Sequence, residues 1–268
     1  MINKEKILEI TKNKTITKLQ AIDQKIINLS QIIDKLPNSI NELFEEFRIL
    51  SDQEFPTVNE FLTIKEYCEL YSLKEINKES LEEIIQDKQN IFKILIIVKS
   101  GVSIKLEPEI KKITNNLSKS ILELIKTKED LEKEISELFK KYYPNTYKIA
   151  TPKIAYKMLE ISGSFERLAR FPASTIQLIG SEKSFFKALK NKKNTPKYGI
   201  IYNHPLLIKL QNKNKGKMAR TLAAKISLAI KADLEGKDIS KELEEKLNKK
   251  LSELKWLKSL EWKDYKKE

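Results

Sequence analysis

The chain has 268 residues, of which 40% are hydrophobic and 33% are charged, and its formal net charge is +13. This length allows one large domain or two of ordinary size, with enough apolar residues to build a core. One cysteine excludes an internal disulfide, and one histidine excludes a metal site built from several histidines. The longest apolar run, from Ile94 to Val98, is too short to cross a bilayer, so we expect a protein of the cell interior with no membrane contact.

A long apolar stripe runs through residues 15–50. Its members recur at alternating intervals of three and four residues, which places one seam on a helix, as a coiled coil requires. They are Leu19, Ile22, Ile26, Leu29, Ile33, Leu36, Ile40, Leu43, Phe47 and Leu50. Pro37 lies inside the stripe, so we expect a kink or break near Leu36, with Asn38 or Ser39 capping the helix that follows.

A second stripe of the same kind follows some way along the chain, with Lys128 at its one polar step. Its members are Ile110, Leu117, Ile121, Leu124, Leu131, Ile135, Leu138 and Tyr142. Two long seams separated by some 60 residues predict an antiparallel helical hairpin. The alternative is two ordinary amphipathic helices in a globular bundle.

Shorter helices are expected between the two stripes, where they would form the tip of the hairpin. One is predicted over Thr57 to Leu73. A second begins at the capping-box pattern that Ser80 opens and runs to Lys99, where Ser100 and Gly101 supply a stop.

The composition changes at Tyr142 to Asn145, so we divide the chain into a domain of residues 1–143 and another of residues 144–268. Helices are predicted over residues 153–162, 174–191, 205–212, 216–232 and 238–260, with Ser174 as an N-cap. Trp256 and Trp262 are expected to pack back on the second domain. Because no alternating strand pattern of useful length occurs, the predicted fold class is all-α.

Positive charge is concentrated in one block of the second domain. Between Lys148 and Lys231 there are 18 lysines and arginines against three acids, a balance of +15, whereas residues 1–147 sum to −2 and residues 232–268 to zero. A generally basic composition would spread its charge along the chain. Charge gathered in this way predicts a polyanion as the partner, most often a nucleic acid.

The candidate contact residues fall in two clusters. The first consists of Lys183, Lys187, Lys190, Lys192, Lys193 and Lys197, and the second of Lys213, Lys215, Lys217 and Arg220. Amide and imidazole groups that could bond unpaired bases are those of Gln177, Asn194 and His204. The alternatives are solubilising surface charge for each lysine, and structural hydrogen bonds for Gln177 and His204.

No arrangement of residues typical of catalysis was found. Gly180 to Lys183 lacks the glycine spacing of a phosphate-binding loop, and acid pairs such as Glu82 and Glu83 lie in polar helical patterns. We therefore expect a protein that is not an enzyme, with no catalytic residue, metal or cofactor.

Four motifs occur in a fixed order in the basic block: Phe171 to Gln177, Gly180 to Lys183, Asn194 to Gly199, and Lys215 to Arg220. Together they resemble the Nop domain, and His204-Pro205-Leu206 is more similar to its archaeal members. The resemblance implies a long antiparallel coiled-coil hairpin with a helical tip, followed by a compact all-helical Nop domain. It also implies a scaffold of box C/D ribonucleoproteins, which guide RNA 2′-O-methylation, or a relative of the spliceosomal Nop-domain protein.

The resemblance also implies which partners and residues are involved. Gly180, Glu182 and Phe186 would contact a small ribosomal-type kink-turn-binding protein. Lys183 and Lys187 would contact the kink-turn RNA of box C/D type, and the segment from Lys215 to Arg220 would lie near RNA. A homodimer through the coiled coil is one expected assembly. The location would be cytoplasmic for an archaeal-type protein and nucleolar or nuclear for a eukaryotic one.

Family members of the box C/D type carry an N-terminal domain that binds fibrillarin, the methyltransferase. The coiled-coil seam begins within about 20 residues of Met1, so we expect this domain to be absent and recruitment of fibrillarin to be in doubt. Two other functions stay open. One is a general basic coiled-coil protein that binds nucleic acid without specificity for a composite surface, and the other is an enzyme or the RNA-binding arm of an enzyme such as a synthetase.

Overall fold

The computed structural model describes residues 21–73, 75–100, 104, 106–192 and 195–264, with side chains described as far as Lys255. Within these ranges the chain is helical and contains no strand, which confirms the all-α class. No helix of the described ranges has both the length and the apolar character that a membrane span needs. The described chain divides into two compact units, which we call the hairpin unit (within residues 32–132) and the bundle unit (residues 21–31 together with the described residues from 133 to 264).

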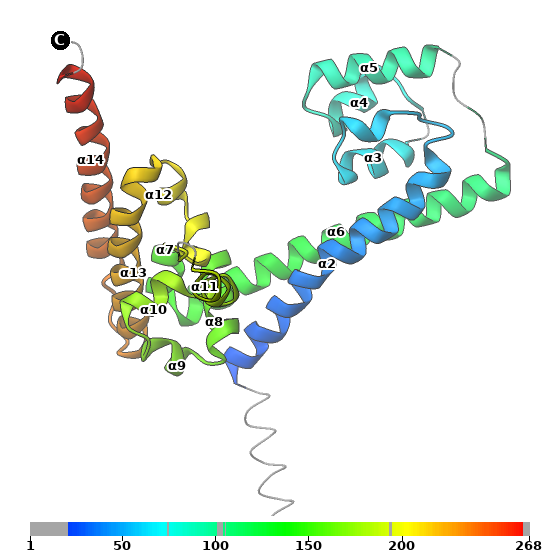
Figure 1. Cartoon of the computed structure of the whole chain (residues 1–268). Coiled ribbons are helices and arrows are strands. Elements are labelled where there is room, and N and C mark those ends of the chain that lie inside the picture. Colours follow the sequence, from blue (N-terminus) through cyan, green and yellow to red (C-terminus); the bar gives the residue numbers. More distant parts are fainter. Residues whose placement is uncertain (1–20, 74, 101–103, 105, 193–194, 265–268) are drawn as a thin grey trace, which may run out of the picture. The chain divides into compact units, whose positions relative to one another are not determined.

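Two long helices contribute to both units: α2 (Ile22–Ser51) and α6 (Pro108–Tyr142) (Figure 1). In the bundle unit, Lys25 near the start of α2 pairs with Glu134 near the end of α6, at 3.0 Å. In the hairpin unit, Glu54 just after α2 pairs with Lys111 near the start of α6, at 2.8 Å. The two helices therefore run antiparallel. Their winding into a coiled coil stays a prediction.

The predicted seams agree with the observed burial at all but one of the described positions. From Ile22 to Leu50 every member of the first stripe is buried or half-buried, and Leu19 lies outside the described residues. In the second stripe the prediction for Tyr142 was wrong, because its side chain is exposed while Phe139 and Tyr143 are buried. The seam shifts there because the helix ends at Tyr142 and the chain turns into the next helix.

The predicted break at Pro37, with a new cap at Asn38 or Ser39, is also wrong, since α2 continues through these residues, whereas a kink there stays a prediction. A proline inside a helix removes one backbone hydrogen bond and costs about 3 kcal/mol. Ile33 and Ile40, one turn on either side, are both buried, and fully burying an isoleucine side chain contributes about 1.5–3 kcal/mol. Burial of the seam thus offsets the cost of the proline.

The hairpin unit is closed by short helices between α2 and α6. These are the 3₁₀ helix η1 (Val58–Glu60), α3 (Ile64–Tyr71), α4 (Lys78–Ile84) and α5 (Lys88–Lys99). The single helix predicted from Ser80 to Lys99 is wrong, because Asn77 caps α4 in a capping box with Ser80, and Asp87 caps α5 separately. The predicted stop agrees at Ser100, which is the C-cap of α5, whereas Gly101 lies outside the described residues.

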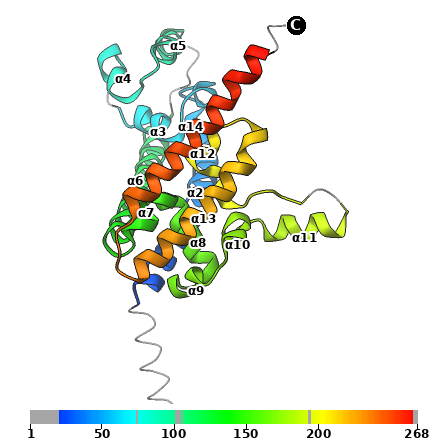
Figure 2. The same cartoon turned by 90° about the vertical axis from the view of Figure 1, so that its left-hand side faces the viewer.

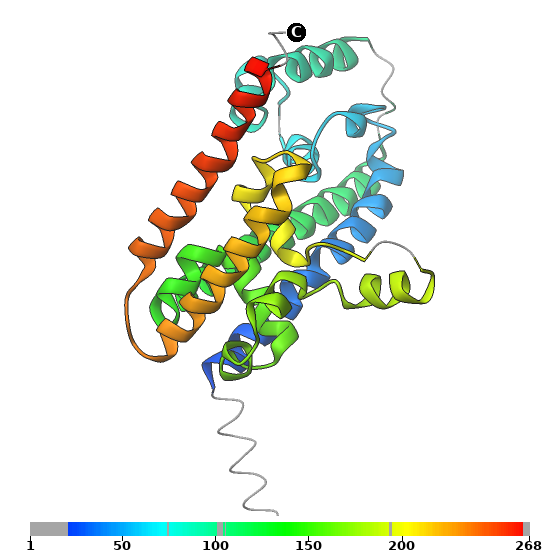
Figure 3. The same ribbon diagram turned by 60° about the vertical axis from the view of Figure 1, so that its left-hand side comes forward.

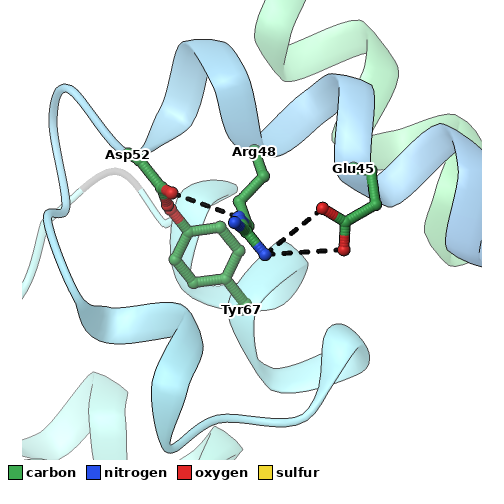
Figure 4. Close-up of polar contacts among 4 residues, drawn as sticks. All are labelled: Glu45, Arg48, Asp52 and Tyr67. Atoms are coloured by element: carbon green, nitrogen blue, oxygen red, sulfur yellow. Dashed lines mark hydrogen bonds and ion pairs between the residues drawn. The ribbon is translucent and has the colours of Figure 1, made fainter.

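A buried aromatic cluster and a chain of polar contacts join the end of α2 to α3. Phe47 packs edge-on against Tyr67 and Tyr71, with ring centroids 5.7 and 5.2 Å away. The Tyr67 hydroxyl donates to Asp52 at 3.0 Å, and Arg48 bridges Asp52 and Glu45 at 3.2 and 3.3 Å (Figure 4). Burial raises the pKa of Tyr67 above its ordinary value, so this hydroxyl stays a donor. The last turn of α2 is thereby held on α3.

The bundle unit is built around one long helix, α13 (Asn212–Leu234). The other helices of this unit that follow α6 are α7 (Pro144–Ala150), α8 (Pro152–Ser162), α9 (Phe165–Ala169), α10 (Ala173–Leu178), α11 (Glu182–Lys190), η2 (Ile200–Asn203), α12 (Pro205–Ile208) and α14 (Ser240–Asp264). The buried face of α13 includes four alanines, Ala219, Ala223, Ala229 and Ala232, which let neighbouring helices approach closely. The predicted packing of Trp256 and Trp262 falls outside the described side chains.

Two polar networks fix the bundle. Asp233 of α13 accepts hydrogen bonds from the backbone N–H groups of Asn145 and Thr146, at 2.9 and 2.8 Å, and thus holds the start of α7. At the start of α2, Asp23 accepts from the Tyr143 hydroxyl and from the Phe165 N–H, the latter at 2.8 Å. The rings of Tyr143 and Phe165 stack with centroids 3.7 Å apart.

Candidate nucleic-acid interface

Within the basic block, one short helix lies apart from the rest of the bundle unit. The segment of residues 180–198, which we call the protrusion, leaves the bundle after α10, carries α11 and returns to η2. Figures 2 and 3 show α11 set off from the other helices of its unit. The single helix predicted over residues 174–191 is therefore wrong, because α10 ends at Leu178 and α11 begins at Glu182. The predicted cap at Ser174 is wrong too, since Pro172 is the N-cap of α10.

Three hydrogen bonds close the neck of the protrusion, where its two ends leave the bundle. The Gly199 N–H donates to Gln177 O at 2.8 Å, and the Ile200 N–H donates to Ile179 O at 2.9 Å. The Gln177 side-chain amide donates to Lys197 O at 2.7 Å. Gln177 thus makes the structural hydrogen bond that was the alternative to a contact with a base.

Two glycines permit this neck. Gly180 has φ +82°, a left-handed conformation that favours glycine, and a Cβ there would lie 2.5 Å from the Ile200 side chain. A Cβ on Gly199 would lie 1.8 Å from the Ile179 carbonyl oxygen, which is an impossible contact. Glu182 turns back on the neck, where its carboxylate accepts from the Gly180 N–H at 2.8 Å. The predicted contact residues Gly180 and Glu182 therefore also shape the start of α11.

The protrusion presents a basic face and an apolar face on one short helix. Lys183, Lys187 and Lys190 are exposed, and their spacing of four and three stacks them on one side. Phe186 and Leu189 are 68% and 55% exposed and lie beside the lysines on the helix surface. A groove of about 450 Å³ separates α10 from α11 and is lined mainly by apolar side chains, including Leu178, Ile179, Phe185 and Phe186.

Two further lysines of the first cluster lie on the protrusion after α11. Lys192 is exposed at φ +50°, and Lys197 is exposed at the neck. Lys193 and Asn194 lie outside the described residues. In the second cluster, Lys213, Lys217 and Arg220 are exposed on the first half of α13, where their spacing of four and three again gives one face.

Two predicted RNA contacts are buried in the structure. His204 is 5% exposed, its Nδ1 accepts from the Leu206 N–H at 3.2 Å, and its Nε2 lies 3.1 Å from Ile149 O. Since Nδ1 accepts, Nε2 carries the proton and donates to Ile149 O. Burial lowers the pKa of His204 below its ordinary value, so the ring is neutral and caps α12. The prediction that His204 faces RNA disagrees with this placement.

Lys215 is the second buried residue, 8% exposed, and its Nζ donates to the Tyr202 hydroxyl at 3.2 Å. From the sequence alone Lys215 groups with exposed cations, because the neighbouring Lys213, Lys217 and Arg220 share its pattern. Tyr202 and Leu189 are exposed and are not among the predicted contact residues. The sequence pattern that could have predicted an exposed Leu189 is the alternation of apolar residues with lysines around it.

Comparison with known proteins places this chain in a family. The family model described as "Nop: snoRNA binding domain, fibrillarin" matches residues 32–253, which is most of the chain. The chain belongs to the Nop family. The motifs in the protrusion, its neck and α13 thus lie inside the matched Nop region.

Among the relatives of this Nop-family chain is a NOP5 family protein of Methanocaldococcus jannaschii, 32% identical over 251 residues, or 92% of this chain and 60% of that protein. Nucleolar protein 58 of Saccharomyces cerevisiae is 29% identical over 256 residues, covering 87% of this chain and 48% of that protein. The chain thus spans about half of the length of these relatives. A solved structure of a fibrillarin/Nop5p complex aligns with a TM-score of 0.55 and 26% identity, over 94% of this chain and 78% of that chain.

Proposed function

We propose that this Nop-family chain is an assembly scaffold of a box C/D ribonucleoprotein. In this proposal the protrusion binds a kink-turn RNA together with the small protein that already occupies the RNA. The role is one of binding and not of catalysis. The observation that carries it is the pair of adjacent faces on α11, one basic and one apolar. Hydrogen bonds across the neck hold this helix to the bundle.

The basic face supports the RNA half of the proposal. Each phosphate that a lysine neutralises releases counterions, so affinity rises with the number of contacts and falls with salt. Lys183, Lys187 and Lys190 line one side of α11, and Lys213, Lys217 and Arg220 line one side of α13. These six cations would contribute affinity without preference for a base sequence.

The apolar face supports the protein half. Phe186 and Leu189 are largely exposed although burying such a side chain contributes about 1.5–3 kcal/mol. The base-paired part of an RNA presents mainly phosphates and sugars and covers an apolar side chain poorly, whereas a small protein bound to that RNA can cover it. An RNA–protein complex presents both phosphates and an apolar protein surface, so it can contact both faces of α11. The RNA alone or the protein alone would contact one face.

The first experiment is a gel-shift titration at physiological salt, with a box C/D kink-turn RNA in the presence and absence of the small kink-turn protein. We expect a ternary complex that forms much more tightly than the complex with naked RNA. Equal affinity in the two arms would contradict the proposal and favour a general basic RNA-binding protein.

Charge reversal locates the surface. Lys183→Glu, Lys187→Glu and Lys190→Glu together should weaken the ternary complex by about tenfold or more and flatten its salt dependence by about two to three in slope. Lys112→Glu, Lys119→Glu and Lys126→Glu make the same charge change on exposed positions of α6 and serve as the control. If both triple variants lose affinity equally, net charge and not the protrusion is responsible.

The apolar face has its own variant. Phe186→Ser should leave binding to naked RNA unchanged and weaken the ternary complex, because only the protein partner covers this ring.

Fibrillarin is added as a fourth component in a separate arm, since the similar solved structure is a complex of fibrillarin with Nop5p. A supershift in that arm would extend the scaffold to a methyltransferase.

A further inference from the structure

A pair of tyrosines lies where the protrusion returns to the bundle. The rings of Tyr198 and Tyr202 stack with centroids 5.5 Å apart and an interplanar angle of 24°. Tyr202 is 44% exposed in spite of this stacking. Tyr198 follows Lys197 directly in the chain, and the pair belongs to the same unit as the exposed lysines of α11 and α13.

A buried cation supports this pair. Lys215, in the first turns of α13, is 8% exposed, and its Nζ lies 4.6 Å from the centroid of the Tyr202 ring and 3.2 Å from its hydroxyl. Among the described residues no carboxylate pairs with Lys215, so its contacts are with a neutral ring and a neutral hydroxyl.

An ammonium in such a position is costly. Lysine is rarely buried without a charged partner, because burying a charge loses its hydration. The cation–π contact with Tyr202 offsets part of this loss. The ammonium has three N–H donors, and the Tyr202 hydroxyl uses one, so two stay available for an anion.

A half-buried Tyr198 stacked on an exposed Tyr202, next to a lysine with no carboxylate partner among the described residues, matches the chemistry of one nucleotide. Unpaired bases of RNA are recognised by stacking on aromatic side chains, and their phosphates by cations. We propose that Tyr198, Tyr202 and Lys215 form a subsite for one unpaired nucleotide of the bound RNA. The base stacks on the tyrosine pair, and the Lys215 ammonium contacts the phosphate. This subsite rests on the proposed function, since the RNA of the ribonucleoprotein is its source of nucleotides.

The test pairs protein variants with RNAs that each lack one base. Tyr202→Leu keeps an apolar side chain but removes the ring, and should weaken the ternary complex by about 5- to 150-fold. Tyr202→Phe keeps the ring and should bind within a few-fold of the wild type. At one position of the RNA, removal of the base should weaken binding of the wild-type protein. The same abasic RNA should bind Tyr202→Leu as tightly as the intact RNA binds this variant. If Tyr202→Leu binds like the wild type, or if its loss persists with every abasic RNA, the subsite is refuted.

Lys215→Met separates a ligand contact from a structural role. Methionine keeps the apolar stem, so the thermal midpoint should not fall, whereas affinity should drop and the slope of log K against log salt should flatten by about 0.7. A lower midpoint with unchanged affinity and slope would overturn the assignment of Lys215.

The proposed function and the subsite fail in different ways. If the wild type forms no ternary complex, the proposed function fails, and the subsite is then tested with a single-stranded RNA that carries 2-aminopurine. Stacking on the tyrosines should quench the fluorescence with the wild type and not with Tyr202→Leu. Equal quenching by both proteins would refute the subsite independently.

Discussion

Gly199→Ala is the sharpest test of how the protrusion is held. The Cβ of an alanine at this position would lie 1.8 Å from the Ile179 carbonyl oxygen and 2.7 Å from two backbone carbonyl carbons. Because these are backbone atoms, no change of side-chain rotamer relieves the contact, and the neck must open. Opening breaks three hydrogen bonds, each with a net contribution of about 0.5–1.5 kcal/mol, so the closed neck should lose about 3 kcal/mol.

Native-state amide exchange measures this loss where it occurs. In the wild type the N–H groups of residues 199 and 200 donate to Gln177 and Ile179 and should be protected. A loss of about 3 kcal/mol corresponds to exchange that is faster by about a hundredfold, since 1.4 kcal/mol is a factor of ten. The ternary complex should weaken as well, because α11 is no longer held in place.

Gly216→Ala is the matched control. Gly216 lies inside α13, and a Cβ there meets nothing within 4 Å. Alanine is the better helix former, so this variant should raise the free energy of unfolding by up to about 1 kcal/mol. Unchanged exchange at residues 199 and 200 in Gly199→Ala would refute the closed neck as described.

The two remaining predictions concern stability. His204 is the only histidine of the chain, and burial lowers its pKa in the folded state. As the pH falls below about 6.5 the unfolded chain takes up a proton that the folded chain resists, so urea unfolding should show stability lost by up to about 1.4 kcal/mol per pH unit. His204→Asn should flatten this dependence, and a wild type as stable at pH 5 as at pH 7 would contradict it. Asp233→Ala leaves the buried N–H groups of Asn145 and Thr146 unpaired and should cost about 3 kcal/mol in the same assay, with Asp233→Asn intermediate, whereas equal stability of all three proteins would refute the network.

The long helices could be predicted because their signal is repeated. Every apolar residue of a seam lies on the same face of the helix, so the pattern predicts that face many times over. Ile33 and Ile40 are therefore buried in spite of Pro37 between them. Proline chemistry on its own favoured a break, and it was outweighed by packing that spans the whole seam. Capping was harder to place, since Ser80 fits the pattern of a cap while Asn77, three residues earlier, makes the hydrogen bond.

The basic surface could be predicted in its chemistry and only partly in its geometry. The charge count indicated the segments that form α11 and α13. The break between α10 and α11 lies at Gly180, whose close approach to Ile200 across the neck is a long-range contact. A lone glycine in a helical pattern is otherwise tolerated. His204 is buried against Ile149, which lies 55 residues away in the chain, and no local pattern carries that information.

The neck also bears on how this family can diversify. Two of its three hydrogen bonds join backbone groups and the third comes from Gln177, which lies outside the protrusion, and of the side chains of α11 only that of Ala188 is buried. Exchange of the residues between Gly180 and Gly199 for those of a relative therefore leaves the core of the bundle untouched. The exposed residues of α11 can thus be changed while the bundle stays folded, and in the proposed scaffold such changes would alter the choice of partner.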